Sequence, residues 1–133
     1  TSDKIKLIEV TKASLDLAIE KVKPGNYIGD IGRVVESLAK KNNFSVVKVL
    51  VGHGVGYAVH EEPNIPNYSE KDRGPQIKAG MVLAIEPMLT MGSAEVRLSK
   101  DGFGYETVDG SLSAHFEHTV AVTEEGNEIL TMI

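Results

Sequence analysis

The hydrophobic pattern of the chain changes its period near residue 44, and this change limits the fold more than any other feature. Before it, apolar residues recur at helical spacing, first from Ile5 to Val22 and then from Ile28 to Leu38. After it, short β-branched runs alternate with turn residues. Helices first and strands afterwards predict an α+β domain with two helices packed on a largely antiparallel sheet.

Breaker residues set the boundaries of the expected elements. The first helix should begin after Ser2 as N-cap and end at Pro24-Gly25, and the second should cover residues 27–42. Strands are expected over residues 45–51, 81–90, 95–98, 104–108 and 114–122, with an edge strand at 128–131. Residues 61–80 are rich in Pro and Gly and predict a long connection, a kind of segment that often carries function.

Size and composition exclude several classes of protein. With 133 residues, the chain is expected to form one domain, 1–133. Its net charge of −5, with scattered basic residues, makes nucleic acid an improbable partner. No apolar run approaches the roughly 20 residues of a membrane span, so no membrane association is expected. The absence of cysteine and of a signal-peptide core favours a cytoplasmic protein.

The four histidines fall in two places, which suggests a shared site. His53 and His60 lie on either side of a glycine-rich turn, and His115 and His118 lie in the last long strand expected. Glycines beside His53 allow tight turns and the close approach of another group. The pattern is neither a dinucleotide-binding fingerprint nor an HExxH zinc motif, because the glycine spacing is wrong and Asn64 stands where the second histidine would be.

Two carboxylates, Glu86 and Glu117, lie in apolar strands, and we expect both to be buried. An unpaired buried carboxylate costs several kcal/mol or takes up a proton. Because neither strand contains Lys or Arg, a shared cation would satisfy both side chains. Together with His53 they form a ligand set suited to Mn, Fe, Co or Zn. The alternative is a neutral core histidine with two protonated or hydrogen-bonded glutamates.

Three stretches match one family together: Gly52–Gly56 with His60–Tyr68, Gly80–Pro87, and Phe116–Thr119. In order and spacing they resemble type I methionine aminopeptidases, and the resemblance extends over nearly the whole chain. It implies the C-terminal half of the pita-bread metallopeptidase fold, in which two pseudo-symmetric α+β halves enclose a site with two divalent metal ions.

The resemblance also implies roles for individual residues. His53, Glu86 and Glu117 would be metal ligands, with Glu117 bridging the two ions. His60 would be the catalytic residue that contacts the scissile region of the substrate, and Phe103 would contribute to substrate binding near the methionine pocket. A structural role remains the alternative for His60, and simple packing of a hairpin remains the alternative for Phe103.

Other expectations concern what the family has and this sequence lacks. Two metal-binding aspartates and one substrate-contacting histidine of the family have no match here, because all six aspartates fall in expected helices or turns. Val59 also departs from the larger or aromatic residue that many members carry before His60. The missing aspartates and histidine predict an incomplete active site, whereas Val59 concerns the shape and side-chain preference of the pocket and leaves the metal ligands unaffected.

The implied activity is the metal-dependent removal of methionine from the N-terminal peptide of protein substrates. The start at Thr1 and the missing aspartates favour an inactive fragment that needs an N-terminal half. One alternative is a noncatalytic peptide-binding module that retains the fold. Another is self-association, in which two copies rebuild the shell through an exposed apolar face.

Overall fold

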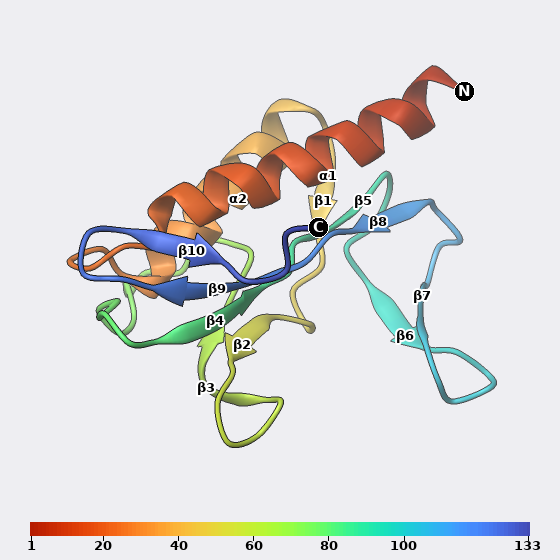
Figure 1. The fold of residues 1–133 in the computed structure, drawn as a ribbon. Helices are drawn as coiled ribbons and strands as arrows, with labels where there is room; N and C mark the ends of the chain where they lie inside the picture. Colours follow the sequence, from red (N-terminus) through yellow and green to blue (C-terminus); the bar gives the residue numbers. More distant parts are fainter.

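A computed structural model describes residues 1–133 and confirms both predicted helices. Helix α1 comprises Ser2–Lys21 and helix α2 comprises Ile28–Lys41, and the two lie side by side on the same layer (Figure 1). The N-cap of α1 is Thr1 rather than the expected Ser2. Neither helix is long and apolar enough to cross a membrane.

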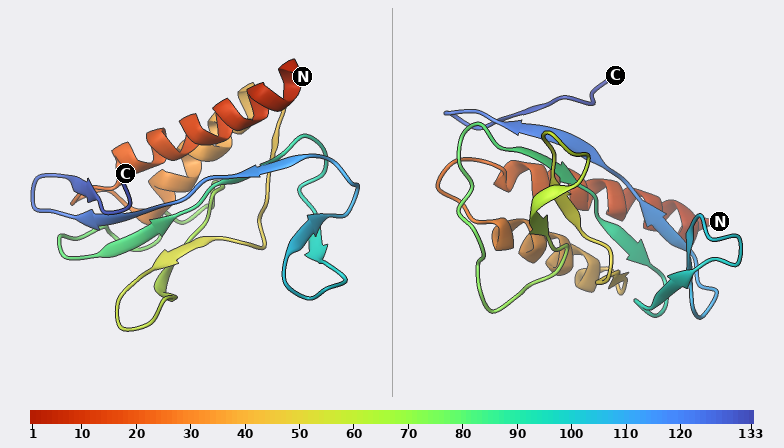
Figure 2. Two further views of the ribbon diagram at one scale, coloured as in Figure 1. Left: turned by 45° about the vertical axis from the view of Figure 1, so that its right-hand side comes forward. Right: turned by 90° about the horizontal axis from the view of Figure 1, so that it is seen from below.

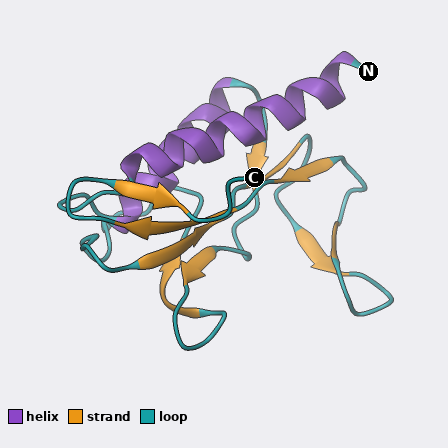
Figure 3. Cartoon of the chain, in the orientation of Figure 1, coloured by secondary structure: helices purple, strands orange, loops and turns teal.

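The helices cover one face of an antiparallel sheet of five strands (Figures 1 and 3). Its order is β10-β9-β4-β2-β3. The strands are β2 (Gly52–Gly54), β3 (Glu61–Ile65), β4 (Val82–Ile85), β9 (His118–Val122) and β10 (Asn127–Ile129). The face away from the helices has no layer of the chain packed over it (Figure 2). The predicted α+β architecture is therefore confirmed.

Two smaller sheets extend from one end of this layer. One has the order β1-β5-β8 and is formed by β1 (Ser45–Val46), β5 (Met88–Thr90) and β8 (Ser113–His115). The other is the predicted hairpin of β6 (Val96–Leu98) and β7 (Tyr105–Thr107), which projects from the body of the molecule (Figure 1).

Several predicted strands have different limits from those expected. The run over residues 45–51 is a strand only at Ser45–Val46, because the chain bends at 48–50 as it passes from the small sheet to the large one. The connection over residues 61–80 contains β3, which the sequence pattern missed because Pro63 lies within it. The final edge strand lies at Asn127–Ile129 rather than at residues 128–131.

The two long strands predicted at 81–90 and 114–122 are each broken in the middle. The first divides into β4 and β5 at Glu86-Pro87, and the second into β8 and β9 at Phe116-Glu117. Proline has no N–H to donate to a sheet ladder, so Pro87 ends the pairing of β4. Both segments then bend together into the smaller sheet, where β5 pairs with β8.

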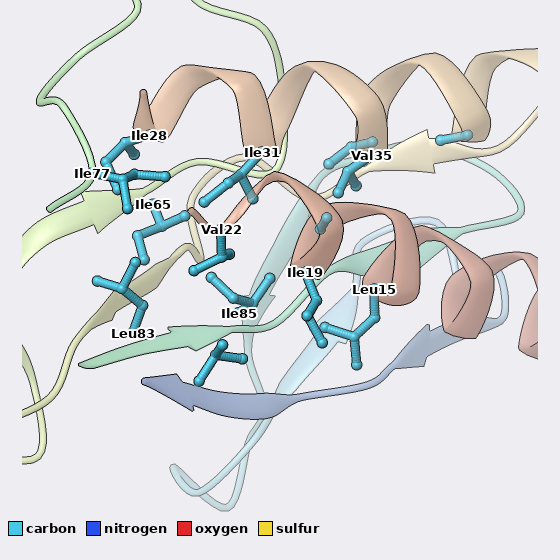
Figure 4. Close-up of a cluster of buried hydrophobic side chains, with 14 of the residues drawn as sticks. Leu15, Ile19, Val22, Ile28, Ile31, Val35, Ile65, Ile77, Leu83 and Ile85 are labelled. Carbon is cyan, nitrogen blue, oxygen red and sulfur yellow. The ribbon is translucent and has the colours of Figure 1, made fainter. Parts of the chain in front are cut away.

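The core lies between the helices and the covered face of the sheet. Leu83, Ile85 and Val120 are fully buried there and contact the apolar stripes of both helices. Figure 4 shows these stripes directed at the sheet, with Leu15 and Ile19 from α1 and Val22 from its C-cap. Because side chains alternate along a strand, the residues between the core positions point to the open face.

Candidate metal centre

The register of β4 and β9 places the two carboxylates opposite each other. Ile85 faces His118 in the antiparallel ladder. Glu86 is the residue directly after β4, and Glu117 is the residue directly before β9. Both glutamates therefore lie at the bend where these two neighbouring segments leave the large sheet.

Strand alternation turns the same residues toward the open face. Leu83 and Ile85 point into the core, so Ala84 and Glu86 point the other way. His53 lies in β2 and is the ladder partner of Ala84, which brings its imidazole to that same face. The structure thus joins three residues that are distant in the sequence.

The geometry of His53 and Glu86 fits a bound cation. His53 is only 8% exposed, and its Nδ1 lies 2.9 Å from the carbonyl oxygen of Gly54. A carbonyl only accepts, so Nδ1 carries the proton and Nε2 is the free ligand atom. Nε2 lies 3.2 Å from Oε1 of Glu86, where two lone pairs would repel unless a proton or metal ion lies between them.

Glu117 completes the cluster, although its environment differs from the prediction. One ligand atom from each of His53, Glu86 and Glu117 lies within 4.8 Å of the others. The Glu86 side chain is 14% exposed, which agrees with the expected burial. Glu117 is exposed, so the prediction that it is buried is wrong. It directly precedes β9, on the open face of the sheet.

His60 stands beside this cluster. Its ring centroid is 4.0 Å from that of His53, with the rings tilted by 41°. His60 lines a groove of about 360 Å³ together with His53, Glu86 and Glu117. With Glu86 it also lines a second, mostly apolar groove of about 480 Å³. His60 is therefore placed where a molecule bound in either groove would meet the cluster.

The structure does not bring Phe103 to the cluster. Phe103 is 95% exposed in the turn between β6 and β7 and lines neither groove. The hairpin carries this turn away from the large sheet (Figure 1). Tyr105, two residues later, is the aromatic side chain that lines the apolar groove.

His115 is a functional candidate to which the sequence pattern gave no role. Its Nε2 lies 3.4 Å from Oε2 of Glu86, and its side chain is 47% exposed. The hydrogen bond to Glu86 raises the pKa of His115, and the charges of Glu86 and Glu117 act in the same direction against partial burial. The signal in the sequence was its position two residues before Glu117, in the second of the two histidine groups.

The cluster of His53, Glu86 and Glu117 contains no aspartate. Asp30 is paired with Arg73 at 2.7 Å. Asp109 accepts backbone hydrogen bonds from Ser93 and Ser111, which lower its pKa to about 2. The acidic side chains available to a metal ion on the open face are therefore Glu86 and Glu117.

A sheet covered by helices on one face carries on its other face a histidine and two glutamates that could hold a metal ion. The chain belongs to metallopeptidase family M24, whose model matches residues 1–124. This confirms the family resemblance expected from the three sequence motifs.

Individual relatives agree with this assignment. Methionine aminopeptidase 1 of Bacillus subtilis is 46% identical over 133 residues, which are 100% of this chain and 54% of the relative. The methionine aminopeptidase of Aquifex aeolicus is 50% identical over 129 residues, or 95% of this chain and 50% of the relative. The chain thus spans about half the length of the curated relatives it matches.

Solved structures confirm the fold as half of a pita-bread domain. The methionine aminopeptidase of Rickettsia prowazekii superimposes with a TM-score of 0.94 at 44% identity, over 99% of this chain and 54% of that one. A prolidase from Pyrococcus horikoshii superimposes with a TM-score of 0.74 at 22% identity, over 99% of this chain and 32% of that one, which is a likeness of fold alone.

Proposed function

We propose that this chain is the C-terminal half, residues 1–133, of a metalloaminopeptidase domain that removes N-terminal methionine from proteins. The observation that carries the proposal is the convergence of His53, Glu86 and Glu117 within 4.8 Å on the open face of the sheet. Similarity to methionine aminopeptidases over the full chain supports the substrate class. The cysteine-free composition supports the cytoplasm as the compartment.

The donor set fits a divalent first-row metal ion. One neutral imidazole and two carboxylates suit Mn, Fe, Co or Zn, and the Nδ1 contact of His53 with a backbone carbonyl is typical of metal-ligating histidines. When bound, such an ion activates water and polarises the carbonyl of the scissile amide.

The residues of the chain orient the substrate around this centre. His60, whose ring lies beside that of His53, would donate a hydrogen bond to the carbonyl oxygen of the scissile amide, where negative charge develops. The apolar groove lined by Val51, Met88 and Tyr105 meets the cluster at Glu86 and offers apolar surface to a substrate side chain. Phe103 would contribute to substrate binding only if the β6–β7 hairpin were folded toward the groove.

Charge limits what these 133 residues do alone. Glu86 and Glu117 supply two negative charges, whereas two divalent ions bring four positive ones. We infer that the isolated chain binds one ion and that further acidic ligands come from an N-terminal half. The exposed apolar side chains Val49, Val59 and Tyr105 beside the grooves offer a surface for that half.

The test is calorimetric titration of Mn²⁺ or Co²⁺ into the metal-free chain. We expect binding of one ion, lost in His53→Ala and Glu86→Gln and retained in the control His118→Ala, because His118 contacts Thr131 and not the cluster. Hydrolysis of a Met-initiated peptide should require addition of the non-overlapping half of the Bacillus subtilis relative.

Each contrary result has a defined meaning. Turnover by the isolated chain would contradict the need for further ligands. Failure of the wild-type chain to bind metal would favour a noncatalytic peptide-binding module. Sedimentation as a dimer without added half would favour self-association of the open face.

A further inference from the structure

The Glu86 carboxylate lies between two histidines, one at each oxygen. Oε1 is 3.2 Å from Nε2 of His53, and Oε2 is 3.4 Å from Nε2 of His115. We propose that His115 is a positioning residue, whose Nε2–H donates to Oε2 so that Glu86 presents only Oε1 to the metal ion. This inference rests on the proposed metal-binding function.

His115 approaches Glu86 from the side away from the metal cluster. It belongs to β8 in the smaller sheet, where it is the ladder partner of Met88. It lines the apolar groove but not the groove that contains His53 and Glu117. It is also absent from the set whose ligand atoms lie within 4.8 Å of one another. His115 is therefore placed to act through Glu86 rather than as a ligand.

Glu86 needs such a partner because its position is otherwise poorly fixed. It follows the last residue of β4, and Pro87 after it cannot donate to a ladder. The terminal torsion of a glutamate side chain is broad, so a free carboxylate turns easily. The Asn67 amide donates to the backbone carbonyl of Glu86 at 3.1 Å, and Nε2 of His115 lies 3.4 Å from its carboxylate. The residue is thus fixed at both ends.

Holding one oxygen has a chemical consequence for the centre. A carboxylate free to rotate can bind an ion through both oxygens, which occupies an additional coordination position. A hydrogen bond to Oε2 would keep Glu86 bound through one oxygen and would leave that position open to solvent or substrate. Such outer partners orient metal ligands, and their loss typically lowers metal affinity about 10–100-fold.

The experiment compares His115→Ala, His115→Gln and the control His118→Ala in the 133-residue chain. Co²⁺ affinity is measured by calorimetry, and infrared difference spectra record the carboxylate stretches, with a ¹³C-labelled Glu86 carboxylate identifying the Glu86 bands. We expect His115→Ala to lower affinity about 10–100-fold. We also expect the splitting between the antisymmetric and symmetric Glu86 stretches to narrow, as two-oxygen binding requires.

The conservative variant separates positioning from a merely structural role. The amide of His115→Gln can still donate to Oε2, so most of the affinity and the wide splitting should return, while His118→Ala should match the wild type. Wild-type affinity and an unchanged splitting in His115→Ala would overturn the inference. If His115→Ala does not fold, a wild-type spectrum must still appear in His115→Gln, and a narrowed splitting there would overturn it.

A metal-free measurement distinguishes this inference from the proposed function. In the apo chain, imidazole ¹⁵N spectra should show a protonated Nε2 on His115 whose shift changes in Glu86→Ala. Failure of the wild type to bind Co²⁺ would overturn the proposed function together with the metal role of His115. If the ¹⁵N shift of His115 is the same in the wild type and in Glu86→Ala, the hydrogen bond itself is overturned, even in a chain that binds Co²⁺.

Discussion

The side-chain amide of Asn67 donates a hydrogen bond of 3.1 Å to the backbone carbonyl of Glu86. Asn67 is fully buried, although it lies in the connection between β3 and β4. The carbonyl of Glu86 lies at the break between β4 and β5, where the sheet ladder offers it no partner. The buried amide therefore replaces a strand at the point where the chain carries a proposed metal ligand.

Replacing Asn67 by Ala should destabilise the fold by about 1–3 kcal/mol, because a buried carbonyl loses its partner. The free energy of unfolding in urea measures the change. Asn64→Ala is the matched control, since Asn64 is an exposed residue of the neighbouring strand β3. Equal stability of the two variants would show that the Glu86 carbonyl gains nothing from Asn67.

Gly52→Ala should destabilise the chain by about 1–3 kcal/mol through overpacking and should also weaken metal binding. Gly52 lies in β2 between two strands, and an added Cβ would meet the backbone carbonyl oxygen of Ala84. Relief of this contact moves β2, and His53 moves with it. Urea unfolding and Co²⁺ calorimetry test the two effects.

The control for this substitution is Gly126→Ala in the turn between β9 and β10. A Cβ at Gly126 meets nothing within 4 Å. The stability and metal affinity of Gly126→Ala should equal those of the wild type. A tolerated Gly52→Ala with unchanged Co²⁺ affinity would contradict the close approach of the two strands.

The parts of this protein that sequence patterns predicted are those governed by local periodicity. Both helices and the hairpin around Lys100–Gly102 follow from apolar spacing and turn residues, and the structure confirms them. The proposed ligand set could also be selected from the sequence, because carboxylates such as Glu86 are rare within an apolar strand. Its convergence with His53 is confirmed as geometry.

The errors lie where tertiary contacts override local pattern. The bend at Glu86-Pro87 depends on a second sheet that no local spacing reveals, so one strand was predicted where two exist. Glu117 lies at the same bend and is exposed, although its apolar neighbours in the sequence predicted that it would be buried. His115 was missed because its contact with Glu86 joins two different chain segments.

Asp30→Asn should reduce stability by up to about 1 kcal/mol at neutral pH, because the neutral amide can still accept the Tyr27 N–H but loses the charged pair with Arg73. The hydrogen bond from Arg73 is the largest cause lowering the pKa of Asp30 below its ordinary value of 3.8. A lowered folded-state pKa means that the ionised form stabilises the fold. This contribution is complete well above pH 3.8 and is lost as the pH falls through the folded-state pKa.

Urea unfolding of wild type and Asp30→Asn between neutral and acidic pH measures this dependence. The difference in unfolding free energy should be constant above about pH 5 and shrink at lower pH. Asp16→Asn is the control, because the Asp16 pair with Lys12 is more than half exposed on both sides and should contribute little at any pH. A difference between wild type and Asp30→Asn that grows on acidification would contradict the ion pair.

Metal ions should raise the thermal stability of the chain, because the cluster of His53, Glu86 and Glu117 exists only in the folded state. A ligand that binds only the folded protein stabilises it by about 2.7 kcal/mol at 100 times its dissociation constant. Thermal unfolding with increasing Co²⁺ should therefore shift upward continuously, and chelation should reverse the shift. His53→Ala should remove the shift, whereas His118→Ala should preserve it. An equal shift in His53→Ala would place the stabilising ion elsewhere on the molecule.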